Sequence, residues 1–225
     1  RSSPSAACAV APESDPMILH GYFRSTASWR VRIALGLKGL EAVQVIHHLR
    51  KGEQRAPDYL ALNPQGLLPA FATDDGAVLT QSLAIIEYLD EISPEPSLLP
   101  ADPVRRAKVR AVAQAVACDI HPVQNLKVLQ RLRDLGLTED QVQAWASTVI
   151  EEGLDAVDKL LADQPGPFAF GDAPTLADLC IVPQLGNARR FGVEVRWPRL
   201  LAIEAACLEL PAFQNAVPGR QPDAD

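Results

Sequence analysis

The sequence predicts an α/β domain followed by an all-helical domain. Between residues 17 and 93, short apolar runs typical of strands alternate with helical segments, whereas beyond residue 103 the apolar residues recur with helical period only. Residues 94–103 contain four prolines and separate the two patterns as a linker. The chain has 225 residues, which is enough for one large domain or two modest domains with real cores.

Composition narrows the class of protein. The chain is 48% hydrophobic and 22% charged, as in an ordinary globular protein, and its net charge of −7 argues against general binding to nucleic acid. No apolar run approaches the roughly 20 residues that a membrane-spanning helix needs. The four cysteines are widely scattered, with no Cys-x-x-Cys pair and no histidine spacing suited to zinc. We therefore expect a cytoplasmic protein with reduced thiols and without a catalytic metal, a nucleic-acid partner or a membrane partner.

Residues 1–16 are rich in Ala, Ser and Pro and show no hydrophobic period. They lack both the basic start and the long apolar core of a secretory signal. We expect a flexible arm without catalytic function. Met17, the only methionine, is a candidate for the native start.

The most informative segment joins a strand at residues 17–23 to the helix that follows it. Three hydroxyl residues, Ser25, Thr26 and Ser28, crowd the point where this helix should begin. A helix N-terminus offers unpaired N–H groups and the positive end of the helix dipole, so it suits an anion such as a thiolate. Ser and Thr are also ordinary N-caps, and the segment alone does not decide between the two interpretations.

The rest of the first domain completes a sheet. The predicted elements are strands at 43–46, 67–72 and 77–80, the last two joined by an Asp-Gly turn, and a helix at 82–92. The order βαβ followed by ββα resembles the thioredoxin fold, in which the bond at the position of Leu68–Pro69 is commonly cis. Ser82 is the expected N-cap of the helix. Because Gln81 and Ser82 open it, N–H groups and a hydroxyl there can hold a carboxylate.

The second domain consists of predicted helices with one apolar face each. One such face lies in segment 109–117, and another, which includes Trp145, runs through the long segment 142–161. A further helix begins at Thr175, where Thr175 and Asp178 have the spacing of a capping box. We expect this box to be structural.

The segment 24–35 resembles the signature of the zeta-class glutathione transferases, the maleylacetoacetate isomerases. Their motif runs Ser-Ser-Cys at the positions of Ser25, Thr26 and Ala27, so the family's cysteine is absent here. The resemblance covers nearly all of residues 17–225, including 81–89 and the ending 220–223. It implies a homodimer, a thioredoxin-like glutathione-binding domain at 17–93, a linker at 94–103 and an all-helical glutathione-transferase substrate domain at 104–225.

The resemblance also implies glutathione as the cofactor. Ser25 would hydrogen-bond the glutathione sulfur and favour its thiolate, with Thr26 as a second donor. The main chain of Leu68 would bind the cysteinyl part. The remaining implied contacts are Gln81 and Ser82 at the γ-glutamyl end, Gln54 at the glycyl end, and His121 and Asn125 from the second domain.

His121 precedes Pro122 on a predicted helix, and Asn125, four residues on, would share its face. A lone helical histidine is more often a packed or surface residue, so a structural role is the alternative for His121. By the same resemblance Lys127 belongs to this neighbourhood, with a solvated surface position as its alternative.

Arginines are the candidates for binding an acidic substrate, because the guanidinium fork matches a carboxylate. The resemblance places an active-site arginine at Arg190, and Arg24 is a second candidate clamp. Adjacent helical residues point about 100° apart, so Arg189 should face elsewhere. We expect Arg30 and Arg32 to form structural ion pairs.

The activity implied by the resemblance is glutathione-dependent cis–trans isomerisation of maleylacetoacetate or maleylpyruvate to a fumaryl product, in the breakdown of aromatic amino acids or aromatic acids. The thiolate adds to the cis double bond, the resulting single bond rotates, and elimination returns the trans product and glutathione. One alternative is conjugation or dehalogenation of small α-halo acids. Another is a non-catalytic scaffold, against which the retention of Ser25, Leu68, Gln81 and Ser82 speaks.

Overall fold

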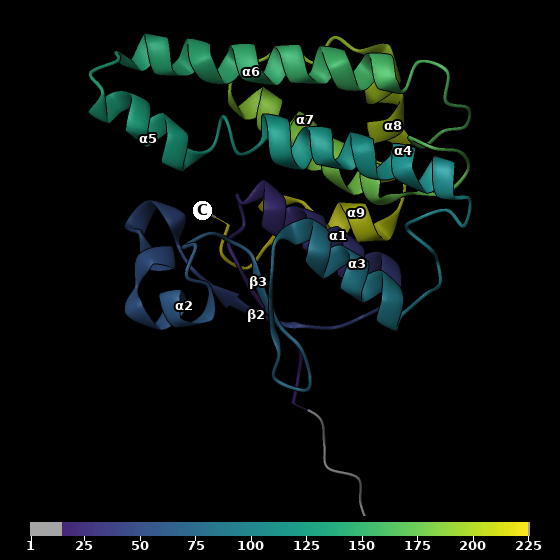
Figure 1. Ribbon diagram of the computed structural model, residues 1–225, viewed down its shortest axis with the longest axis horizontal. Coiled ribbons are helices and arrows are strands. Elements are labelled where there is room, and N and C mark those ends of the chain that lie inside the picture. The colour runs from purple at the N-terminus through teal and green to yellow at the C-terminus, as the bar shows by residue number, and fades with distance from the viewer. Residues whose placement is uncertain (1–14, 225) are drawn as a thin grey trace, which may run out of the picture.

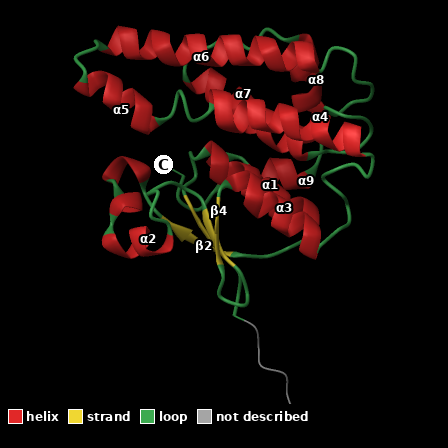
Figure 2. Cartoon of the chain, viewed as in Figure 1, coloured by secondary structure: helices red, strands yellow, loops and turns green. Residues whose placement is uncertain are grey.

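The computed structural model describes residues 15–224 and places a small sheet with its helices beneath a larger layer of helices (Figures 1 and 2). The expected arm over residues 1–16 lies almost entirely outside the described residues. The predicted α/β half followed by an all-helical half is confirmed. Within residues 15–224, no helix has both the length and the apolar content to cross a bilayer.

The sheet has the order β2-β1-β3-β4, with β1 parallel to β2 and β3 antiparallel to both of its neighbours. Its strands are β1 (Ile18–Gly21), β2 (Val43–Ile46), β3 (Ala70–Ala72) and β4 (Val78–Thr80). β3 is shorter than the predicted strand 67–72. Pro69 has no N–H to donate, and the carbonyl of Leu67 accepts hydrogen bonds from Tyr59 Oη at 2.6 Å and Asn63 Nδ2 at 2.8 Å. The chain before Ala70 is therefore held by a loop and not by a neighbouring strand.

The helices predicted after residue 24, at 82–92, within 109–117 and 142–161, and from Thr175 are all present, together with further short helices. They are α1 (Thr26–Lys38), α2 (Pro57–Leu62) and α3 (Ser82–Ile92) in the first half, then α4 (Pro103–Gln114), α5 (Leu126–Asp134), α6 (Glu139–Leu160), α7 (Leu176–Arg190), α8 (Pro198–Leu208) and α9 (Pro211–Ala216). The capping box of Thr175 and Asp178 opens α7 as expected. Trp145 departs from its predicted buried face, being 41% exposed, because its indole N–H reaches out to donate to the carbonyl of Val123 at 3.0 Å.

α1 lies between the two halves and contacts helices of both (Figure 1). It packs on α3 below, on α7 above and on α9, which returns from the C-terminal end of the chain. Gly36 makes this return possible, since a Cβ there would lie 3.0 Å from that of Ala212. The N–H of Phe23 donates to Asp223 at 2.9 Å and fixes the loop that leads into α1. One continuous apolar core thus spans both halves and holds the N-terminus of α1 in place.

Candidate active site

A cavity of about 1320 Å³ lies between the two halves, at the N-terminal ends of α1 and α3. Segments 49–55 and 63–69 close its lower side, and residues 117–127 together with the end of α7 close its upper side. Sites for small ligands commonly measure about 300–1,000 Å³, so this cavity has room for a peptide-sized ligand together with a small second one.

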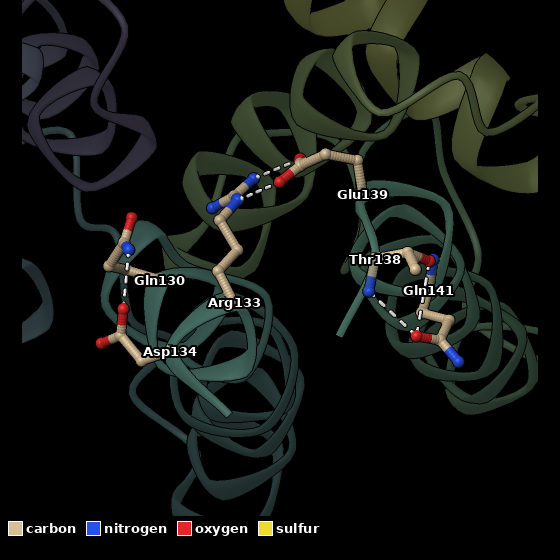
Figure 3. A network of polar contacts seen from close by, with 6 residues as sticks. All are labelled: Gln130, Arg133, Asp134, Thr138, Glu139 and Gln141. Carbon is tan, nitrogen blue, oxygen red and sulfur yellow. Dashed lines mark hydrogen bonds and ion pairs between the residues drawn. The ribbon is translucent and has the colours of Figure 1, made fainter. Parts of the chain in front are cut away.

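The lining of the cavity is strongly cationic. None of the described residues that line it is Asp or Glu, although the chain carries a net charge of −7. Its cationic residues are Arg24, Arg30, Arg50, Lys51, Arg55, Lys127, Arg133 and Arg190. Arg133 is partly neutralised, since its guanidinium donates to the Glu139 carboxylate at 2.7 and 2.9 Å. Figure 3 shows this pair. The rest give the cavity a positive field that attracts anions.

Ser25 is the N-cap of α1, and its Oγ accepts a hydrogen bond from the N–H of Ser28 at 3.1 Å. This contact uses a lone pair only, so the hydroxyl hydrogen of Ser25 can still donate into the cavity. Thr26 Oγ1 is buried and has no hydrogen-bond partner within the described chain. Ala27 also lines the cavity but offers only its main-chain N–H. Capping and anion binding are therefore compatible at this site.

The start of α3 corrects one prediction. Ser82 is the first helical residue and not the N-cap, a position that Gln81 occupies with φ 70° and ψ 116°. A positive φ is unfavourable for a residue with a side chain and is found where a site over-determines the backbone. This geometry leaves the first N–H groups of α3, at Ser82, Leu83 and Ala84, beside the cavity that all three residues line. The Gln81 amide donates to Gln65 at 3.0 Å.

The two loop residues predicted to bind glutathione also line the cavity. Leu68 stands next to Pro69, and the Leu68–Pro69 bond is cis as expected. Gln54 lies in a short 3₁₀ turn (Glu53–Arg55), and its buried Oε1 has no partner among the described residues. Both residues therefore face the same space as the starts of α1 and α3.

His121 and Asn125 line the cavity but do not share a helix face, so that prediction is wrong. A π-helical segment (Ala115–Ile120) follows α4, the chain turns over residues 121–124, and Asn125 is already the N-cap of α5. Pro122 is compatible with a turn but cannot donate to the helical ladder. Burial and the positive charges of Arg30 and Arg190 hold the pKa of His121 well below its usual range. His121 is therefore neutral near pH 7.

The adjacent arginines of α7 face different partners. Arg189 forms a two-pronged ion pair with Glu204 of α8, with contacts of 2.5 and 2.6 Å. Arg190 turns to the cavity, donates to the carbonyl of Arg24 at 2.9 Å and contacts the amide oxygen of Asn187. Burial and the nearby charges of Arg24 and Arg50 lower the pKa of Arg190. The predicted divergence of the two side chains is confirmed.

Among residues 15–224, Arg30 and Arg32 do not form the predicted ion pairs with carboxylates. Arg32 donates to the carbonyls of Tyr22, Phe23 and Ala216, whereas Arg30 lines the cavity and donates to Ser82. Sequence reasoning missed Arg30 and Arg50 as cavity residues. Only the three-dimensional gathering of cations without acids identifies them, and the sequence pattern carries no signal for it.

Two protein-family models match this chain. The glutathione S-transferase N-terminal domain matches residues 24–92, and the glutathione S-transferase C-terminal domain matches residues 129–205. The maleylacetoacetate isomerase of Pseudomonas aeruginosa is 50% identical over 210 residues, covering 92% of this chain and 98% of that protein. The maleylpyruvate isomerase of Ralstonia sp is 49% identical over 213 residues, covering 92% of this chain and all 100% of that protein.

Solved structures agree with these relatives. The holo structure of maleyl pyruvate isomerase, described as a bacterial glutathione S-transferase of the zeta class, superposes with a TM-score of 0.89 at 47% identity, covering 92% of this chain and 100% of that one. A maleylacetoacetate isomerase from Anaeromyxobacter dehalogenans, with glutathione bound in its active site, gives a TM-score of 0.85 at 43% identity, covering 93% and 98%.

Proposed function

This chain belongs to the zeta class of the glutathione S-transferases, and from that premise we propose that it is a glutathione-dependent cis–trans isomerase of maleylacetoacetate or maleylpyruvate. One observation carries the proposal most directly. The cavity is lined by cations and by the N-terminal ends of α1, α3 and α5, and no acid lies among its described lining residues. Glutathione and maleyl acids are all anions, so they fit this lining.

The residues present also fit glutathione in detail. Thr26 Oγ1 and Gln54 Oε1 are buried polar atoms without partners within residues 15–224, and a polar ligand would satisfy both. In our proposal Ser25 and Thr26 bind the sulfur, the main chain of Leu68 binds the cysteinyl part, and the start of α3 binds the γ-glutamyl carboxylate. Gln54, His121 and Asn125 supply further contacts.

The chemistry that bound glutathione supplies is reversible addition of its thiolate to the cis double bond, which leaves a single bond that can rotate. Ser25 and Thr26 act by donating hydrogen bonds that favour the thiolate over the thiol. Arg190 and Arg24 hold a substrate carboxylate and stabilise negative charge as it moves onto the substrate. Neutral His121 can donate or accept a hydrogen bond without adding another positive charge.

A direct assay tests the function. Maleylacetoacetate and maleylpyruvate are offered separately, with and without glutathione, and the conversion to the fumaryl product is followed. We expect turnover that requires glutathione and is restored by each addition of substrate, because glutathione is regenerated. If the protein binds glutathione but isomerises neither acid, the isomerase proposal is wrong and α-halo acids become the substrates to test. If it does not bind glutathione, the cavity does not serve this chemistry.

We further propose that the enzyme is a cytoplasmic homodimer, as the family resemblance implies. Analytical ultracentrifugation of the purified chain measures the assembly directly, and a monomer at micromolar concentration would contradict this part of the proposal. Fractionation of cells expressing the natural protein tests its location.

A further inference from the structure

Arg30 is a buried cation that the protein itself does not satisfy. Arg30 is 1% exposed, yet it is one of the residues that line the cavity. Nη1 donates to Ser82 Oγ at 3.2 Å, whereas Nε and Nη2 have no hydrogen-bond partner within the described chain. No Asp or Glu among residues 15–224 forms an ion pair with it. A buried charge without a partner is strongly unfavourable, so its presence requires an explanation.

Arg32, two residues further along α1, shows how this fold satisfies a buried guanidinium when the role is structural. Its three nitrogens donate to the carbonyls of Ala216, Phe23 and Tyr22 at 3.2, 3.1 and 3.5 Å. The negative charge of Asp223 partly offsets its burial. Each of the three nitrogens of Arg32 thus has a partner in the chain itself. Arg30 has no comparable negative charge beside it within residues 15–224, and an anion bound in the cavity would supply one.

The contact between Arg30 and Ser82 has a defined direction. A guanidinium can only donate, so the Ser82 oxygen must accept. The hydroxyl hydrogen of Ser82 is then left to donate to something else. Ser82 stands at the N-terminus of α3, beside unpaired main-chain N–H groups that face the cavity. The Ser82 hydroxyl and the neighbouring main-chain N–H groups are therefore available to one anion.

We propose that Arg30 is a positioning residue for the α-carboxylate of the γ-glutamyl group of glutathione. It turns the Ser82 hydroxyl into a donor toward that carboxylate and supplies the positive charge beneath it. This inference rests on the proposed function, because it needs glutathione in the cavity. The side chain lies one helical turn beyond Thr26, but its hydrogen bond is to Ser82, which assigns it to the carboxylate and not to the sulfur.

The test uses two ligands that differ only in this carboxylate. One is glutathione, and the other carries a 4-aminobutanoyl group in place of the γ-glutamyl group. Calorimetric titration compares the wild type with Arg30→Met, Ser82→Ala and the double variant. For Arg30→Met we expect glutathione to bind about 10- to 100-fold more weakly and the analogue to change by less than about threefold. In the Ser82→Ala background the loss from Arg30→Met should shrink, because the two residues act as a unit.

Thermal unfolding separates positioning from support of the fold. Without glutathione, Arg30→Met should unfold at the same or a higher temperature than the wild type, since it removes an uncompensated buried charge. Arg32→Met is the matched control: it should unfold at a lower temperature, because it removes the donor that Arg32 supplies to the carbonyls of Phe23 and Ala216. Arg30→Lys keeps the charge and should recover part of the glutathione affinity.

Three results would overturn the inference. The first is an equal loss of affinity for both ligands in Arg30→Met. The second is a loss of glutathione affinity in the double variant equal to the sum, in free energy, of the losses in the two single variants, and the third is a destabilised Arg30→Met that Arg30→Lys does not rescue. Each leaves the proposed function standing if the wild type binds glutathione. A wild type that binds neither ligand would instead refute the proposed function itself.

Discussion

The two walls of the cavity offer anions different kinds of donor. The lower wall has two helix starts, at Thr26 and Ser82, whose main-chain N–H groups and hydroxyls are fixed by the fold, and cations of residues 24–55 surround them. The upper wall has one helix start, that of α5, where the N–H of Leu126 already donates to Asn125 Oδ1 at 2.7 Å. Its other donors are mainly side chains, among them Arg190, Lys127 and His121. Donors fixed by the backbone suit a ligand of constant shape, whereas flexible cations suit an acid whose position changes during reaction.

This difference assigns work to each wall. In our proposal glutathione is bound mainly by the lower wall, and the acidic substrate mainly by the upper wall. The hydrogen bond from Arg190 to the carbonyl of Arg24 crosses between them, so the substrate site depends on both halves being in contact. Substitutions in the two walls should therefore change different kinetic constants.

The sharpest test of this division is a pair of substitutions in α7. Arg190→Ala should lower kcat/KM for a maleyl dicarboxylate, because it removes the guanidinium that pairs with a substrate carboxylate. The expected loss of transition-state binding is about 2–4 kcal/mol. Its glutathione affinity should stay nearly unchanged. Arg189→Ala is the matched control and should be much milder toward the substrate, since Arg189 pairs with Glu204 outside the cavity. Steady-state kinetics with both variants would refute the assignment if Arg189→Ala proved the damaging change.

The lower wall is tested by Ser25→Ala. Losing a hydrogen bond to the thiolate should raise the activation free energy by about 1.5–3 kcal/mol, which reduces turnover roughly ten- to a hundredfold. Glutathione binding should fall much less, because our proposal places most binding contacts at the ends of the tripeptide. The pKa of bound glutathione, followed by thiolate absorbance, should rise in the variant. Turnover close to that of the wild type would transfer the role to Thr26 or to main-chain donors.

The same contrast explains how far the sequence predicts the site. Ser25, Thr26 and Ser82 stand in local patterns, where a strand ends and a helix begins, so the lower wall could be anticipated from spacing. The positive φ of Gln81 could not, because strain at one residue depends on the surrounding fold.

The upper wall depends on tertiary contacts. The helix predicted through His121 and Asn125 ends in a turn, which the apolar period of segment 109–117 does not indicate. The missing carboxylate beside Arg30 could not be foreseen either. An ion pair is a reasonable expectation for a buried arginine, and only the structure shows which neighbours are within reach. The divergence of Arg189 and Arg190 was predictable, since it follows from helical geometry alone.

A smaller effect is expected at Ala27, where the motif that this sequence resembles has a cysteine. Ala27→Cys should leave isomerase activity within about tenfold of the wild type, because the nucleophile is glutathione and not the protein. The new thiol at the start of α1 should nevertheless react readily with an alkylating reagent. Mass spectrometry after brief treatment with iodoacetamide measures this alkylation, and the wild type treated in the same way is the control. An activity gain of several orders of magnitude would show that the cysteine matters for catalysis.

The smallest expected effect is on the pH dependence of the free energy of unfolding, through His121. Its pKa is lowered in the folded state from 6.5, so the unfolded chain binds more protons between the folded pKa and about 6.5. The free energy of unfolding should therefore fall as the pH drops below about 6.5 and stay level, for this group, above it. Compared with the wild type, His121→Gln should lose less stability between pH 7.5 and 5.5. Bound glutathione places negative charge near Arg30 and Arg190 and should shrink this difference.

His47→Gln is the control, because burial also lowers the pKa of His47 but that residue does not line the cavity. A response to glutathione that is equal at both histidines would contradict an anion site between the two walls.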